Sequence, residues 1–222
     1  MTERSSIHHL PTGAWAFDDG VTDVFEDMLR RSIPDYDAMR RVVFDVGRRF
    51  VRPGTDVLDI GCSRGDALAP YIAEFGYGAR YVGVEVSQPM LETVRKRFAT
   101  ECERGIVEIQ DIDLRKVFPT VQASLTLSVL TLQFVPVEHR GRVVRNVFEH
   151  TVDGGAFVLV EKILGNSAQL TEMLIDDASN ALIPTNGAGS LSTRGLRSRI
   201  SRTVDSAFAR SVLYATSTLR SS

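Results

Sequence analysis

The stretch Asp56-Val-Leu-Asp-Ile-Gly-Cys-Ser-Arg-Gly65 decides how the rest of this chain is read. A short apolar run, interrupted by Asp59, leads directly into a segment with two glycines. This pattern is typical of a buried parallel strand that ends in a tight turn and continues into a helix. Glycines let backbone N–H groups approach a ligand closely, and a helix beginning near Asp66 directs its positive end to the same place. The stretch therefore predicts a small-molecule site at the carboxyl end of a central strand.

Strand-like and helix-like segments alternate along residues 53–177. After the first strand, strands are expected at residues 80–85, 106–109, 123–128 and 156–160, the last preceded by a turn at Gly154-Gly155. Helices are expected at residues 67–75, 87–102 and 137–150, the last with its inner face made of Val143, Val144, Val147 and Phe148. The alternation predicts an α/β fold, a doubly wound and mostly parallel sheet that binds its ligand in residues 53–177.

Three further regions flank this core. Residues 1–14 are polar and predict a flexible N-terminus, while residues 15–52 hold two amphipathic segments that predict a helical cover. Residues 178–222 contain ten Ser, five Thr and six Arg but a single acid, Asp205. This composition predicts a disordered tail and a sheet that lacks its C-terminal strands, although residues 211–219 have the pattern of a strand.

Composition narrows the partners of the chain. A net charge of −2 and a pI of about 6.1 argue against a broad phosphate-binding surface. Cys62 and Cys102 lie far apart and have no metal-ligand spacing, which favours a reducing, cytoplasmic location without a metal site. The N-terminus is too polar for a secretory signal, and the uncharged residues 121–137 are too polar for a membrane span. We therefore expect no membrane partner.

The identity of the ligand follows from the strand ends. Glu85 comes 26 residues after Asp59 at the end of the next expected strand, where an acid accepts hydrogen bonds from a ribose diol. Ser63 stands where a dinucleotide-binding turn has its middle glycine, which disfavours a diphosphate. Asp111 and Ile112 follow the third expected strand and are placed to bind an adenine. S-adenosyl-L-methionine carries ribose and adenine without phosphates, so it is the predicted cofactor.

These motifs resemble a known family. Asp59-Ile-Gly-Cys-Ser63, Glu85, Asp111-Ile112 and Gly154-Gly-Ala156 are similar to the class I S-adenosylmethionine-dependent methyltransferases. More narrowly, residues 15–176 resemble the carboxy-S-adenosylmethionine synthase group. That narrower similarity rests on segments outside the cofactor core, namely Phe17-Asp18, Val24-Phe-Glu-Asp-Met28, Arg31-Ser-Ile-Pro-Asp-Tyr36, Thr131-Leu-Gln-Phe134 and Glu161-Lys162.

The resemblance implies a cofactor pocket, residue by residue. Its members would be Tyr36 on the cofactor, Gly61, Cys62 and Ser63 along the methionine and ribose, Glu85 and Val86 at the ribose, Asp111 and Ile112 at the adenine, and Ser128 and Val129 at the sulfonium. Asp59 is expected to orient the cofactor amino group. Arg31 and Gln133 are candidates for substrate contact, and no residue stands out as a catalytic base. Synthases of this group bind the added carboxylate with an arginine in a C-terminal helical segment, and no matching segment is found in residues 178–222.

The predicted function is methyl transfer from S-adenosylmethionine to an acceptor that the sequence does not identify, with a small molecule expected as the substrate. Two alternatives stay open. One is synthesis of carboxy-S-adenosylmethionine from prephenate, which would concern tRNA only indirectly, through wobble-uridine modification. The other is a cofactor-binding protein that has lost catalysis. The narrower resemblance also implies a homodimer.

Overall fold

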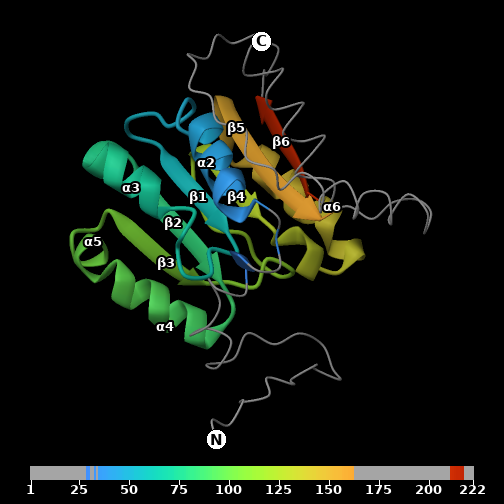
Figure 1. Cartoon of the computed structure of the whole chain (residues 1–222), viewed down its shortest axis with the longest axis horizontal. Helices are drawn as coiled ribbons and strands as arrows, with labels where there is room; N and C mark the ends of the chain where they lie inside the picture. Colours follow the sequence, from blue (N-terminus) through green and yellow to red (C-terminus); the bar gives the residue numbers. More distant parts are fainter. Residues whose placement is uncertain (1–28, 31–32, 34, 163–210, 218–222) are drawn as a thin grey trace, which may run out of the picture.

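The computed structural model of the chain describes residues 29–30, 33, 35–162 and 211–217. Its centre is a six-stranded sheet with the strand order β3-β2-β1-β4-β5-β6 (Figure 1). The strands are β1 (Asp56–Ile60), β2 (Arg80–Glu85), β3 (Val107–Asp111), β4 (Ala123–Val129), β5 (Thr151–Lys162) and β6 (Ser211–Ser217). The first five are parallel, and β6 runs antiparallel to β5. The predicted doubly wound α/β fold is confirmed.

Helices cover both faces of the sheet. They are α2 (Tyr36–Gly47), α3 (Ala69–Phe75), α4 (Gln88–Arg97), α5 (Ala99–Glu103) and α6 (Val137–Glu149), with short 3-10 turns at Gly76–Gly78 and Leu132–Phe134. Met39 of α2 and Tyr71 of α3 pack in one core cluster with Val57 of β1. Val143 of α6 packs in a second cluster with Leu58. Successive strand residues point to opposite faces, so the apolar run of β1 supplies both clusters.

The strand order places the ligand site. From β1 the chain moves outward through β2 and β3, then returns to the other side of β1 through β4 and β5. The loops after β1 and β4 therefore diverge, and the crevice between them is where open α/β sheets bind ligands. The N–H groups of Gly61 and Cys62 donate to Val84 O at 2.8 and 2.9 Å, which keeps the turn after β1 beside β2.

Three element boundaries differ from the sequence-based expectation. Helix α3 begins at Ala69, not near Asp66, because Gly65 has a φ of +78° and Pro70 suits a first helical turn. The helix expected at residues 87–102 is divided into α4 and α5 at Phe98, whose φ and ψ of −108° and 28° are not helical. Gly154 lies inside β5 at a register irregularity with a φ of +69°, so the expected turn is a bulge within a longer strand.

The inner face of α6 is narrower than expected. Val143 and Val147 are buried, whereas Val144 and Phe148 are exposed to 41% and 53%. Residues four apart share one face of a helix, while the next residue is rotated by about 100°, so only one of the two pairs contacts the sheet. The expectation that Val144 and Phe148 face inward was wrong.

Of the C-terminal region, residues 211–217 are described, and they form β6. This strand pairs with β5 from Ala156↔Ser217 to Lys162↔Ser211, which confirms the strand expected near residues 211–219. One C-terminal strand is therefore present at the sheet edge. The flexible N-terminus predicted at residues 1–14, most of the first helix of the cover and the remainder of the tail lie outside the described residues. Every helix in the described part is too short or too polar to cross a bilayer.

Candidate cofactor-binding site

Glu85 joins the two turns that border the crevice. Its side chain is largely buried, with an exposed fraction of 9%. The Oε2 atom accepts a hydrogen bond from Ser63 N at 2.9 Å, and Oε1 accepts from Val86 N at 2.8 Å and Ser87 N at 3.0 Å. One carboxylate at the tip of β2 thereby holds the turn after β1 against the turn after β2. The structure thus brings together Ser63, Glu85 and Val86, three of the residues predicted for the ribose end.

Asp59 is a buried carboxylate with an unused acceptor. Its side chain is 1% exposed, and among the described residues its Oδ2 atom has no hydrogen-bond partner. Burial raises the pKa of Asp59 from 3.8 to about 7; the charge of Arg40 opposes this effect, and the charges of Glu85 and Asp66 add to it. An unpaired buried acceptor is costly, and a bound cationic donor would satisfy it. The ammonium group of S-adenosylmethionine is such a donor, so the residues present fit this cofactor.

The turn after β1 is shaped by close packing. Gly61 has a φ of +74°, and a Cβ atom there would lie 2.3 Å from the Thr131 side chain. Ser63 also adopts a positive φ, 48°, which directs its N–H to Glu85. Cys62 is 3% exposed, and burial raises the pKa of its thiol well above the ordinary value. Cys62 is therefore a packed residue of the turn and not an activated nucleophile.

The residues predicted for the adenine end are partly engaged by the protein itself. Asp111 is exposed at the end of β3, and its Oδ2 atom accepts a hydrogen bond from Gln88 Nε2 at 2.7 Å. The N–H of Ile112 donates to Glu85 O at 3.2 Å. The resemblance placed Ile112 at the adenine, and in the structure its N–H extends the pairing of β2 and β3. The carboxylate of Asp111 remains exposed to solvent at the end of β3.

Ser128 and Val129 do not face the same way. Val129 packs against the core cluster that contains Cys62. Ser128 is its strand neighbour, so its side chain points to the α6 face, where its Oγ atom is buried without a partner among the described residues. Of the two residues predicted at the sulfonium, Val129 therefore has its side chain on the face of the cluster with Cys62 and Ser128 has its side chain on the other face, because adjacent strand residues alternate.

The remaining predicted site residues are Tyr36, Gln133 and Arg31, and their surroundings differ. Tyr36 is the first residue of α2 and is buried in the same core cluster as Cys62. The side-chain amide of Gln133, predicted to contact substrate, donates to Leu130 O at 2.9 Å and so stabilises its own loop. Arg31 lies outside the described residues.

Two residues that sequence reasoning did not assign to the site fix the loop after β4. Glu161, at the end of β5, accepts hydrogen bonds from Leu132 N at 2.7 Å and Gln133 N at 3.0 Å. Burial raises its pKa, and these backbone donors counteract the effect. Arg140 of α6 donates to Val135 O at 2.7 Å and to Gln133 O at 3.1 Å. The available signal was that Glu161, like Glu85, is an acid at a strand tip.

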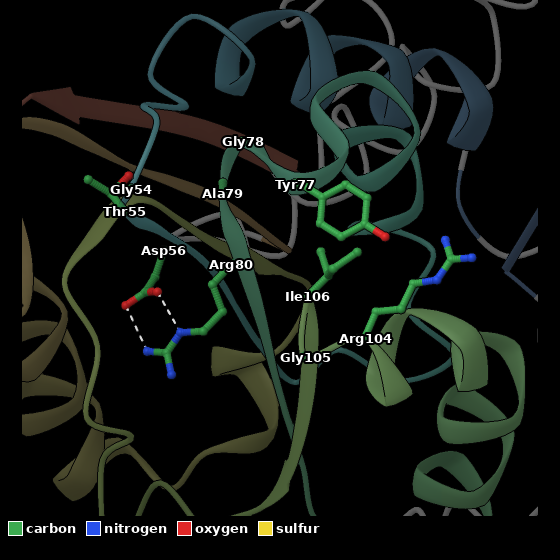
Figure 2. A pocket seen from close by; sticks show the side chains of 10 residues that line it. All are labelled: Gly54, Thr55, Asp56, Tyr77, Gly78, Ala79, Arg80, Arg104, Gly105 and Ile106. Atoms are coloured by element: carbon green, nitrogen blue, oxygen red, sulfur yellow. Dashed lines mark hydrogen bonds and ion pairs between the residues drawn. The ribbon is translucent and has the colours of Figure 1, made fainter.

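A separate hollow of about 380 Å³ lies at the amino ends of β1 and β2 (Figure 2). On one side of it, Arg80 donates to both oxygens of Asp56 at 2.8 and 3.0 Å; on the other side lie Tyr77 and Arg104. Glu85 and the glycine turn are at the opposite ends of these strands. Because parallel α/β sheets bind ligands at their carboxyl ends, this hollow is distinct from the cofactor site.

Comparison with known proteins identifies the family. A family model described as a methyltransferase domain matches residues 57–155. The carboxy-S-adenosyl-L-methionine synthase of Methylococcus capsulatus is 38% identical over 162 residues, which cover 72% of this chain and 67% of that protein. The synthase of Erwinia tasmaniensis is 33% identical over 180 residues, which cover 79% of this chain and 73% of that protein. The chain belongs to the carboxy-S-adenosyl-L-methionine synthase family.

Membership of this family confirms the resemblance that the sequence motifs carry. The solved structure of StiE O-MT, residues 942–1257, shares the fold with a TM-score of 0.54 and 18% identity, covering 84% of this chain and 75% of that one. The methyltransferase domain includes Asp59, the glycine turn, Glu85 and Asp111. This member of the synthase family is an S-adenosylmethionine-dependent enzyme of the methyltransferase class.

Proposed function

We propose that the chain transfers the methyl group of S-adenosylmethionine to a small-molecule acceptor bound above the turn after β1. The observation that carries the proposal is the Glu85 carboxylate, which holds Ser63 N and Val86 N at the tips of two neighbouring strands. This arrangement presents a buried acid and backbone groups at the switch point of the sheet, where a ribose would be bound. The methyltransferase domain match over residues 57–155 supports the same chemistry.

The bound cofactor supplies an activated methyl group on a positively charged sulfur. The main task of the protein is therefore to align the acceptor with this methyl group and to exclude water, and not to activate the acceptor. Asp59 would orient the ammonium group of the cofactor's methionyl part, and Glu85 would orient its ribose. The loop after β4, held by Glu161 and Arg140, would form a rigid wall beside Gly61. Helix α2, which begins at Tyr36, would close the same side and exclude water.

A second candidate is synthesis of carboxy-S-adenosylmethionine. It is favoured by the names of the curated relatives, which are 38% and 33% identical to this chain. Synthases of this family bind the added carboxylate with an arginine in a C-terminal helical segment, and residues 178–222 contain no matching segment. For this candidate a positively charged side chain from another part of the chain must therefore bind the carboxylate.

One experiment separates the two reactions. The purified chain is incubated with methyl-labelled S-adenosylmethionine, with and without prephenate, and the nucleosides are identified by mass spectrometry. Formation of S-adenosylhomocysteine and transfer of label to a small-molecule extract support methyl transfer, whereas a prephenate-dependent carboxylated nucleoside supports the synthase. Glu85→Ala is expected to abolish either product, and Glu92→Ala, an exposed acid on α4, is the matched control. Label recovered only in RNA would contradict the small-molecule acceptor.

Cytoplasmic location and homodimer formation complete the proposal. Support for a reducing compartment comes from Cys62 and Cys102, which are both free thiols. Sedimentation of the purified chain tests the dimer, and a monomer at micromolar concentration would contradict it.

A further inference from the structure

The loop after β4, residues 130–136, begins in a strained backbone conformation. Leu130 has a φ of +61°, in a region that bulky residues rarely adopt. Two hydrogen bonds hold it there: Leu130 N donates to Val160 O at 2.7 Å, and Leu130 O accepts from the side-chain amide of Gln133 at 2.9 Å. Strained residues persist only where their surroundings fix them, and they cluster at functional sites. The strain at Leu130 therefore indicates that the position of this loop matters for function.

The Glu161 carboxylate fixes the next part of the loop. One of its oxygens accepts a hydrogen bond from Leu132 N at 2.7 Å, and the other accepts from Gln133 N at 3.0 Å. Hydrogen bonds to an ionised carboxylate are roughly twice as strong as those between neutral groups. A glutamine in place of Glu161 could accept from only one of the two N–H groups, because its amide nitrogen is itself a donor. The hold on this loop therefore depends on the carboxylate and not only on the shape of the side chain.

Thr131 connects this loop to the glycine turn after β1. It lies between the strained Leu130 and the two residues that Glu161 holds. Its hydroxyl donates a long hydrogen bond to Gly61 O at 3.4 Å, and a Cβ atom built on Gly61 would lie only 2.3 Å from the Thr131 side chain. The loop and the turn are thus in direct contact, so a displacement of Thr131 would also displace Gly61.

We propose that Glu161 is a positioning residue for methyl transfer. By holding the loop after β4, its carboxylate keeps Thr131 against Gly61 and so fixes the side of the glycine turn where the cofactor's sulfur meets the acceptor. Glu161 acts through Thr131 and touches no reacting atom. This inference rests on the proposed function, because it takes S-adenosylmethionine as the ligand of the crevice. The adenosine half of the ligand would be held by Glu85 and Asp111, at the ends of β2 and β3, and should not depend on Glu161.

Calorimetry with two nucleosides tests the proposal on variants shown to be folded by circular dichroism. S-adenosyl-L-homocysteine carries the sulfur and the chain beyond it, whereas adenosine ends before the sulfur. Glu161→Gln is expected to weaken binding of S-adenosyl-L-homocysteine about 10-fold, the effect of one charged hydrogen bond, and binding of adenosine less than about 2-fold. Glu149→Gln, a change of an exposed acid at the end of α6, is the matched control and should alter neither affinity.

A double-mutant cycle with S-adenosyl-L-homocysteine alone tests the route through Thr131. Thr131→Ala should weaken binding by a factor similar to that of Glu161→Gln. Adding Glu161→Gln to Thr131→Ala should then weaken binding less than about 2-fold further, because the contact that Glu161 positions is already lost.

The outcomes are distinguishable. Equal weakening of both nucleosides in Glu161→Gln would show a general effect on the fold and overturn the proposal, as would an unchanged affinity for S-adenosyl-L-homocysteine. Effects of the two single changes that multiply in full in the double variant would overturn the route through Thr131. A wild-type chain that does not bind S-adenosyl-L-homocysteine would overturn the cofactor assignment itself, which separates that failure from a failure of Glu161.

Discussion

Replacing Asp59 by Asn should change how the stability of the fold depends on pH. Asp59 is buried to 1% exposure in the middle of the sheet, and burial raises its pKa to about 7, against an ordinary value of 3.8. Between these two pH values the folded chain keeps the proton on Asp59 and the unfolded chain releases it. The unfolded state then binds fewer protons, so the free energy of unfolding falls as the pH rises.

The size of the effect follows from the two pKa values. Their separation of about three pH units corresponds to about 4 kcal/mol, at roughly 1.4 kcal/mol per unit. This contribution is fully present below pH 4, is lost progressively up to about pH 7, and changes no further above it. Asparagine has nearly the same shape and does not titrate. The Asp59→Asn variant should therefore gain about 4 kcal/mol relative to wild type between pH 4 and pH 8.

Urea unfolding followed by circular dichroism at pH 4, 5, 6, 7 and 8 measures this difference. Asp113→Asn is the control, because hydrogen bonds from Arg115 hold the pKa of Asp113 at about 2, so its removal should leave the slope above pH 4 unchanged. If Asp59→Asn keeps the wild-type dependence on pH, Asp59 is ionised throughout and the reasoning is refuted. A companion measurement is ligand affinity: binding of S-adenosylhomocysteine should strengthen as the pH rises toward 7, because its ammonium group requires the ionised form of Asp59.

The remaining predictions concern packing and pairing. Gly61→Ala should lower the free energy of unfolding by about 2–4 kcal/mol in urea titrations, because the new Cβ meets the Thr131 side chain and the φ of Gly61 is positive. Adding Thr131→Ala to this variant should recover part of the loss. A loss below about 0.5 kcal/mol in Gly61→Ala would contradict the close contact. Glu161→Gln should cost about 1–2 kcal/mol by removing the charged acceptor of two backbone N–H groups, and hydrogen exchange should speed up in the loop after β4. Arg80→Met should cost about 1–2 kcal/mol, because its carboxylate partner is buried, whereas the same change at exposed Arg115 should have a clearly smaller effect. Equal costs at the two arginines would contradict the role of burial.

The sequence alone determined the layered α/β fold and the edge of the sheet that binds ligand. Both are encoded in local signals: a buried strand followed by glycines, and acids at the ends of the next strands. Glu85 illustrates this, because an acid at the carboxyl end of a parallel strand lies at the ligand-binding edge of the sheet once the strand order is known. The class of ligand also followed, since Ser63 replaces the glycine that a diphosphate requires.

Only the tertiary structure decided which side chains meet in the crevice. Glu161 lies on β5, far from the glycine turn in sequence, and its contact with the loop after β4 depends on how β5 pairs with β4. Ser128 and Val129 are adjacent in sequence, yet the pleat of β4 sends them to opposite faces. The backbone at Gly154-Gly155 is also not decided by local sequence, because two glycines are compatible with a turn or with a bulge. The pairing of β5 with β4 selects the bulge. Local patterns specify the elements, whereas long-range packing sets the distances between charges, and these distances determine the chemistry of the site.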